Sequence, residues 1–234
     1  MDSQDPVAVA AFRAIRAGDT TSLASLLSQH PGLACEQIQG TRTPLHVVAD
    51  WPGYFPAGPA TVRLLIGAGA DPNADTGGDQ AETPLHWAAS SDDADVAEAL
   101  ISGGASIETP GGSIGTPLDN AIGYGCWNVA RLLVRKGARV DKLWHAAALG
   151  IMPRVDELLA ASPAPSAGDI TEAFWHACHG GQRRTAERLL ASGADLDATP
   201  GYSDQTAAQV AAEPGTQREN LITWLNERQQ ASGG

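Results

Sequence analysis

Apolar and small residues recur along the chain in a pattern that predicts repeated helices. A leucine, or another residue in its place, is followed three and four positions later by a pair of small or branched residues, as Leu85 is by Ala88 and Ala89. This spacing places the three side chains on one helix face, and the small pair allows close contact with a neighbouring helix. Seven positions begin the pattern, at intervals of 34, 40, 33, 25, 31 and 34 residues: Ala11, Leu45, Leu85, Leu118, Leu143, Phe174 and Ala208.

Clusters of aliphatic residues follow these positions and predict a second helix in each unit. Residues 62–66 and 130–134 are examples, and the helices that contain them are expected to end at Gly69 and Gly137, which can adopt the left-handed conformation. A Thr-Pro pair opens several first helices, because threonine accepts free amides of the first turn and proline there loses no donor. The fold is therefore predicted to be all-α, apart from short hairpins between units.

Three of the helix starts share a four-residue motif. Residues 43–46 and 83–86 are Thr-Pro-Leu-His, residues 116–119 are Thr-Pro-Leu-Asp, and residues 69–71 and 193–195 are Gly-Ala-Asp. These motifs and a period of about 33 residues resemble the ankyrin repeat. The resemblance extends over almost the whole chain.

The resemblance implies a solenoid of about seven helical pairs joined by short hairpin fingers. It predicts one ankyrin-repeat domain over residues 1–230, followed by a disordered tail at residues 231–234. Most members of this family bind other proteins, so a partner protein is the first expectation.

Three segments depart from the regular spacing. The interval from Leu118 to Leu143 is short, so the finger near residues 139–142 is predicted to be missing. Residues 161–168 are rich in proline and small residues and are predicted to form a linker. Residues 50–59 lengthen the second unit and form an aromatic loop insertion.

Charge and cysteine content narrow the expected surroundings and partners. Fifteen basic and 27 acidic side chains give a formal charge of −12, and no basic cluster is present, so nucleic acid is not expected as a partner. Three cysteines in different units predict neither a disulfide framework nor a zinc site. The acidic N-terminus and the absence of a long apolar run predict a cytoplasmic protein without a membrane span.

The resemblance also indicates which side chains face the groove. In ankyrin repeats, the positions two, five and six after the leucine of the motif look into the concave surface. These positions, together with the aromatic loop, provide the candidate binding residues Asp50, Trp51, Tyr54, Phe55, Trp87, Ser90, Asn120, Tyr124 and His179, and the candidate acid-base residues His145 and His176.

The three groove histidines are the sharpest chemical candidates. His176 and His179 are three residues apart on one helix face, and His145 belongs to the adjacent inner helix. A metal site would need further converging ligands, and Glu172 is the nearest extra candidate, so no metal or other cofactor is predicted. Acid-base chemistry or hydrogen bonding to a ligand remains open, beside the simpler interpretation that these imidazoles pack against one another.

Several other polar and aromatic residues have structural explanations. The resemblance implies that His46 and His86 bond neighbouring backbone and side-chain groups at the helix start. Trp144 and Trp175 occupy the same position in later units and are either core or pocket wall. Asp93 or Asp95 is predicted to cap a helix rather than to bind metal.

The aromatic loop at residues 50–59 has two interpretations that the sequence leaves open. Trp51, Tyr54 and Phe55 would be costly to leave bare in water, so they either seal the first three units or fold over the groove as a lid near Trp87 and Ser90.

Two functions follow from these observations. The first is a binding module that recognises a partner protein through its concave groove. The alternative is an enzyme or a small-molecule receptor, in which His145 and His176 carry out cofactor-independent acid-base chemistry on a mostly apolar small molecule. A closed pocket of several hundred cubic ångström, bounded by the Trp51 loop and the three histidines, would favour the alternative.

Overall fold

A computed structural model describes residue 2, residues 4–216 and residues 218–232. These residues form helices and loops, without a β-strand; an isolated antiparallel bridge joins Gln39 to Arg42. The all-α prediction is therefore confirmed. The chain divides into two compact units, residues 1–138 and 139–234, and the expectation of a single domain over residues 1–230 stays a prediction.

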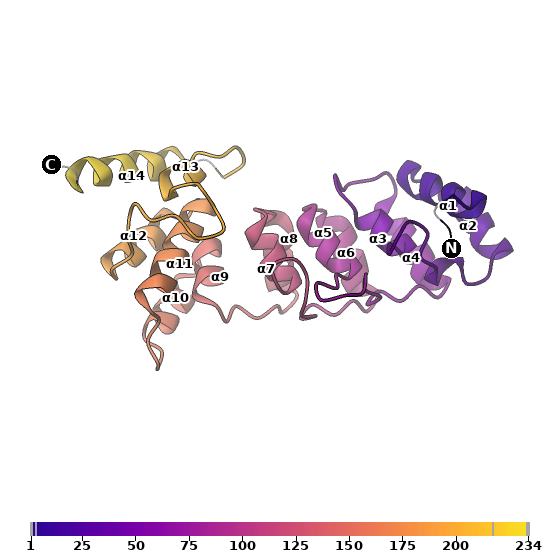
Figure 1. Cartoon of the computed structure of the whole chain (residues 1–234), viewed down its shortest axis with the longest axis horizontal. Helices are drawn as coiled ribbons and strands as arrows, with labels where there is room; N and C mark the ends of the chain where they lie inside the picture. Colours follow the sequence, from indigo (N-terminus) through magenta and orange to yellow (C-terminus); the bar gives the residue numbers. More distant parts are fainter. Residues whose placement is uncertain (1, 3, 217, 233–234) are drawn as a thin grey trace. The chain divides into compact units, whose positions relative to one another are not determined.

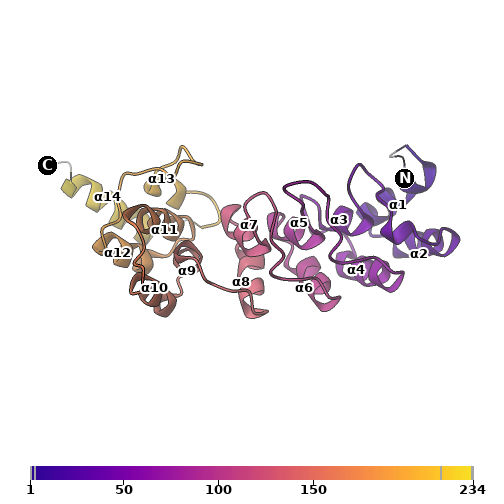
Figure 2. The same ribbon diagram turned by 60° about the horizontal axis from the view of Figure 1, so that its bottom comes forward.

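The first unit consists of successive helical pairs. Inner helices α1, α3, α5 and α7 contact one another in order, and the outer helices α2, α4, α6 and α8 do the same (Figure 1; Figure 2). The bounds are α1 Pro6–Ala17, α2 Thr20–Gln29, the short 3₁₀ helix η1 Leu33–Cys35, α3 Pro44–Ala49, α4 Gly58–Gly67, α5 Pro84–Ser90, α6 Ala94–Ser102, α7 Pro117–Gly123 and α8 Trp127–Arg135.

The recurring apolar positions form the core of this unit. Leu45 and Leu85 are completely buried, and Leu118 is nearly so. The small pair after Leu85, Ala88 and Ala89, is also completely buried. Small side chains at these positions allow α5 to pack closely against α3 and α7.

The histidines of the Thr-Pro-Leu-His motif connect neighbouring repeats. Thr83 donates its backbone N–H to His86 Nδ1 at 3.1 Å, and Nε2 of the same ring lies 3.1 Å from the carbonyl oxygen of Gly115 in the next finger. His46 makes the corresponding contact with the carbonyl oxygen of Glu82 at 2.9 Å. Burial lowers the pKa of both histidines, so each ring is neutral. Their predicted structural role is confirmed.

The second unit is built around the long helix α11, which contacts α9, α12 and α13. Its core includes Leu143, Phe174 and Trp175, and Trp224 of the last helix. The bounds are α9 Leu143–Leu149, α10 Met152–Leu159, α11 Ala167–His179, α12 Arg183–Ala191, α13 Ala207–Ala211 and α14 Glu219–Ser232.

Trp175 occupies the position that a motif histidine has in the first unit. It is 6% exposed, and its indole Nε1 donates to the carbonyl oxygen of Gln205 at 2.9 Å. The ring thus fills the core and makes the bond to the following finger, and it also lines a pocket of the second unit, so it meets both of its interpretations. Trp144 is half-buried and stacks on His176 with ring centroids 4.7 Å apart.

The connections between helical pairs differ in length. Residues 68–83 connect α4 to α5, whereas residues 136–142 connect α8 to α9 and residues 160–166 connect α10 to α11. Helix α14 extends to residue 232, so the first half of the tail that the sequence predicted to be disordered is helical. Residues 233–234 lie outside the described residues.

Candidate functional site

A pocket of about 340 Å³ opens on the inner face of the first unit. It brings together the end of α3, the aromatic loop, the helix α5 and the residue that follows α7. Five of its residues are candidates from the sequence, and every lining residue belongs to the first unit. The lining residues are Arg42, Asp50, Trp51, Glu82, Trp87, Ser90, Ser91, Ser113 and Tyr124.

Three aromatic rings border this pocket. Trp51 is 75% exposed and Tyr124 is 53% exposed, so both present apolar surface to solvent. The third ring, that of Trp87, is half-buried. The guanidinium carbon of Arg42 lies 4.9 Å from the centre of this ring. Because aromatic rings bury large areas when a partner covers them, these rings are natural contact points.

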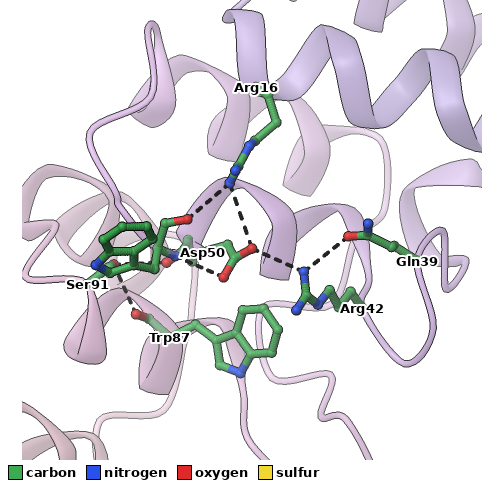
Figure 3. A network of polar contacts seen from close by, with 8 residues as sticks. Arg16, Gln39, Arg42, Asp50, Trp87 and Ser91 are labelled. Carbon is green, nitrogen blue, oxygen red and sulfur yellow. Dashed lines mark hydrogen bonds and ion pairs between the residues drawn. The ribbon is translucent and has the colours of Figure 1, made fainter.

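A network of charged groups fixes one side of the pocket (Figure 3). Asp50 Oδ2 lies 3.2 Å from Arg42 Nη1 and 3.7 Å from Arg16 Nη1. Arg16 also donates to the carbonyl oxygen of Trp51 at 3.2 Å, and Arg42 donates to Gln39 Oε1 at 3.1 Å. The two arginines therefore neutralise Asp50 and orient the start of the aromatic loop.

Asn120 lies behind the pocket rather than in its lining. It is completely buried, and its amide donates to Glu82 Oε1 at 3.0 Å and accepts the backbone N–H of Ile114 at 3.1 Å. Glu82 Oε1 also accepts the backbone N–H of Ser113 at 2.9 Å. The sequence placed Asn120 on the binding face, but its polar atoms instead connect α7 to two fingers.

The aromatic loop is attached on both sides. Tyr54 donates its backbone N–H to Asp93 Oδ2 and its hydroxyl to the carbonyl oxygen of Asp92 at 2.7 Å. The Phe55 ring packs beneath Arg16, whose guanidinium carbon lies 4.2 Å from the ring centre. These contacts support the sealing interpretation for Phe55. Tyr54 is attached to the next repeat but remains 55% exposed, and Trp51 is exposed at the pocket.

The predicted cap of α6 is confirmed. Asp93 accepts the backbone N–H of Val96 at 3.0 Å and is almost completely buried. Its neighbour Asp92 has a positive φ of 55° and accepts the backbone N–H of Val129 in the next outer helix at 2.9 Å. These two carboxylates therefore cap helices.

The groove histidines form a separate cluster in the second unit. His145, His176 and His179 are 2%, 4% and 7% exposed. His176 and His179 have ring centroids 6.3 Å apart, and Trp144 and Trp175 pack against them. The imidazoles that the sequence placed in the groove thus lie among aromatic side chains.

Burial controls the protonation of His176. It lowers the pKa to about 3, with smaller contributions from His179 and His145. Burial also lowers the pKa of His179, although Glu213 opposes the shift. A ring with a pKa near 3 is neutral at neutral pH, so it lacks the acidic imidazolium proton and is a weak base, and His176 is therefore poorly suited to acid-base catalysis.

The outer nitrogen of His176 contacts the finger that precedes α13. Nε2 lies 2.8 Å from the hydroxyl of Tyr202, and that hydroxyl donates to Glu172 Oε1 at 3.3 Å. Because a phenol has one proton to give, donation to Glu172 assigns the imidazole proton to Nε2. The Nδ1 atom of His176 is buried without a hydrogen-bond partner among the described residues.

Two searches of the described residues give negative results. Over the ranges that the structure describes, no three or more His, Cys, Asp or Glu side chains are grouped so that they could bind a metal ion. None of the helices described above combines the length and the apolar character that a membrane span requires.

Four lining residues are not among the candidates from the sequence: Arg42, Glu82, Ser91 and Ser113. Ser91 is the sixth residue after Leu85 and therefore occupies a groove position. Arg42 and Glu82 each directly precede the threonine of a Thr-Pro-Leu-His motif. The last residue of a finger therefore points to the same pocket in consecutive repeats, and this shared position was the signal that could have identified both. Ser113 lies in the finger before α7 and had no such signal.

Comparisons with known proteins agree with this architecture. The family model for ankyrin repeats (3 copies) matches residues 9–110 and 55–142, which together span more than half of the chain. The structure is similar to the human ASB11 ankyrin repeat domain, with 19% identity, a TM-score of 0.56, and coverage of 96% of this chain and 98% of that one.

A second similar structure is the ankyrin repeat domain of Bcl-3, described as a unique member of the IkappaB protein family, with 23% identity and a TM-score of 0.54. The match covers 97% of this chain and 100% of that one. At these identities the structural likeness concerns the fold alone, and no curated protein matches the chain. From its repeats and the matching family model, the chain belongs to the ankyrin-repeat family.

Proposed function

We propose that this protein is a binding module that recognises a partner polypeptide through the pocket of the first unit. The observation that carries the proposal is the convergence of Trp51, Trp87 and Tyr124 on one pocket of about 340 Å³. A large exposed aromatic side chain loses unfavourable contact with water when a partner covers it, and tryptophan and tyrosine dominate many protein interfaces.

The aromatic loop is suited to this task because its backbone is fixed before binding. Arg16 bonds the carbonyl oxygen of Trp51, and Tyr54 bonds the turn between α5 and α6. A side chain on a fixed loop loses less conformational freedom on binding than one on a mobile loop. Trp51 can therefore contribute contact area at low entropic cost.

Charge indicates what kind of polypeptide would bind. Between Arg63 and Arg131 the chain contains ten Asp and Glu residues and neither Lys nor Arg. Some of these carboxylates cap helices, as Asp93 does, whereas Glu82 lines the pocket and Asp75 and Asp79 are exposed in the same finger. A basic segment with an apolar or aromatic side chain would be attracted to this face and would fill the pocket.

Selection from a library of displayed random peptides tests the proposal. Peptides selected on the wild-type protein should be rich in Lys or Arg, and their affinity should fall as salt increases. Trp51→Ala and Tyr124→Ala should each weaken binding of a selected peptide about tenfold or more, as expected for central aromatic contacts.

Ile114→Ala is the matched control, because Ile114 is a 44% exposed apolar residue of the same unit that does not line the pocket. It should leave the affinity of these peptides within about twofold of wild type, since it removes no contact in the pocket. Selected peptides that tolerate both Trp51→Ala and Tyr124→Ala would refute the proposed site. Failure to select any peptide would refute recognition of short linear segments by this pocket.

A further inference from the structure

A second, larger pocket lies within the second unit, and the proposed function does not use it. Its volume is about 580 Å³, within the usual range of roughly 300–1,000 Å³ for ligand sites. It lies between the first turns of α11 and the loop that follows α12. The lining residues are Ala167, Gly168, Thr171, Glu172, Trp175, Gly193, Asp195, Ala198, Thr199, Pro200, Gly201 and Tyr202.

The charged groups of this lining are all negative. Glu172 and Asp195 contribute carboxylates, and none of the lining residues is Lys, Arg or His. Glu172 accepts the Tyr202 hydroxyl at Oε1, and Asp195 accepts the backbone N–H of Asp197 at Oδ1 at 3.0 Å. Among the described residues neither carboxylate forms an ion pair, so each has an oxygen available to a donor from outside.

Hydrogen bonds to residues of α11 hold Tyr202 and Asp195 in place. His176 is 4% exposed, and its Nε2 lies 2.8 Å from the hydroxyl of Tyr202, which in turn donates to Glu172. On the other side, Thr171 Oγ1 accepts the backbone N–H of Asp195 at 3.0 Å. The carboxylates and the phenol ring are therefore arranged before a ligand arrives, which lowers the cost of binding.

We propose that this pocket binds an ammonium group, carried either by a small organic amine or by a lysine side chain. An ammonium group can donate to Glu172 and Asp195 in charge-assisted hydrogen bonds. The same cation is attracted to the face of an aromatic ring, here Tyr202 or Trp175. The apolar remainder of the pocket, from Ala167, Ala198 and Pro200, can accept a hydrocarbon body.

Other ligand classes fit the lining less well. An anion would be repelled by both carboxylates, because no cation of the lining compensates them. A neutral apolar ligand would desolvate the carboxylates without giving them a partner, which costs binding free energy. Positive charge on the ligand is therefore the property that distinguishes this proposal.

The test is an NMR titration of the full chain with benzylammonium, using benzyl alcohol as the neutral ligand of similar shape. Benzylammonium should bind with a dissociation constant near or below about 1 mM, as expected for a small ligand of this size. The amide signals of Glu172, Asp195 and Tyr202 should shift. Benzyl alcohol should bind at least tenfold more weakly, because it lacks the charge.

Two variants and a control test whether the carboxylates of Glu172 and Asp195 bind the ammonium group. Glu172→Gln and Asp195→Asn should each weaken benzylammonium binding several-fold, and the double variant should weaken it tenfold or more. Asp204→Asn makes the same change in net charge at an exposed residue of the same loop that does not line the pocket. It should have little effect. Circular dichroism establishes that each variant is folded, and the single variants keep the test valid if the double variant is not.

A tripeptide, acetyl-Gly-Lys-Gly-amide, distinguishes the two sources of the ammonium group. Binding of the tripeptide alone, or much more tightly than benzylammonium, would support a lysine side chain; the reverse would support a free amine. The proposal is overturned if neither probe binds, if benzyl alcohol binds as well as benzylammonium, or if Asp204→Asn weakens binding as much as the double variant. These outcomes are independent of Trp51 and Tyr124, so they do not bear on the proposed function of the first unit.

Discussion

Replacement of His86 by leucine should destabilise the first unit strongly, because the imidazole joins two backbone groups of different repeats. Its Nδ1 accepts the backbone N–H of Thr83 at 3.1 Å, and its Nε2 donates to the carbonyl oxygen of Gly115 at 3.1 Å. The ring is completely buried, and Thr83 is 2% exposed. Leucine has similar bulk and neither function, so the substitution tests the hydrogen bonds more than the packing.

The expected loss follows from the two backbone groups that lose their partners; the Thr83 hydroxyl, 2.9 Å from Nδ1, loses a contact as well. A buried polar group without a partner costs about 1–3 kcal/mol, so the two backbone groups together give about 2–6 kcal/mol. The N–H of Thr83 should account for the larger share, because Gly115 is half-exposed and water can reach its carbonyl oxygen.

His86→Asn separates these two contributions. In the next repeat, Asp119 has the position of His86, and its Oδ2 accepts the backbone N–H of Thr116 at 2.7 Å. A short side-chain oxygen is therefore sufficient for the bond within the repeat. Asparagine should keep that bond and lose the bond to Gly115, so it should cost about 1–2 kcal/mol.

Urea unfolding of the three proteins, followed by both circular dichroism and tryptophan fluorescence, measures the free energy differences. The two signals are compared because coincident transitions are the test of two-state unfolding in a chain with two compact units. A loss below about 1 kcal/mol for His86→Leu would refute the unsatisfied-group argument. Equal losses for leucine and asparagine would show that the contact with Gly115, rather than the cap, carries the stability.

Three further predictions concern stability. Leu118→Ala should lower the unfolding free energy by about 2–5 kcal/mol in urea titrations, because Leu118 is 2% exposed in the core; a loss below about 1 kcal/mol would contradict that role. Gly18→Ala should lower the melting temperature clearly, because φ is 67° and an added Cβ would lie 2.2 Å from the carbonyl oxygen of Pro56; an unchanged melting temperature would refute this close approach. Burial lowers the pKa of His176 to about 3, so the unfolded chain binds protons that the folded chain does not, and stability should decrease as pH falls from about 6.5 toward 3. Unfolding at a series of pH values should show a smaller decrease for His176→Gln, and an identical pH dependence would contradict the buried neutral imidazole.

The sequence by itself determined the helical pairs of this protein, because the signals that specify them are local and recur in successive repeats. Leu85 with its small pair, the Thr-Pro helix starts and the glycine ends depend on contacts within one repeat or with its immediate neighbour. The same local logic predicted that Asp93 or Asp95 caps a helix. The role of His46 and His86 at the helix starts was implied by the resemblance to the ankyrin repeat, and the hydrogen bonds of both rings agree with it.

The tertiary structure alone decided which polar and aromatic side chains are available to a partner. Asn120 and His176 occupy groove positions by register, yet one bonds two fingers and the other lies beneath Tyr202. Residues 50–59 could have been a seal or a lid, and the bonds of Arg16 and Tyr54, which come from other repeats, attach the loop and leave Trp51 exposed. Exposure depends on side chains brought together from distant parts of the chain, and a repeat period contains no information on where those side chains meet.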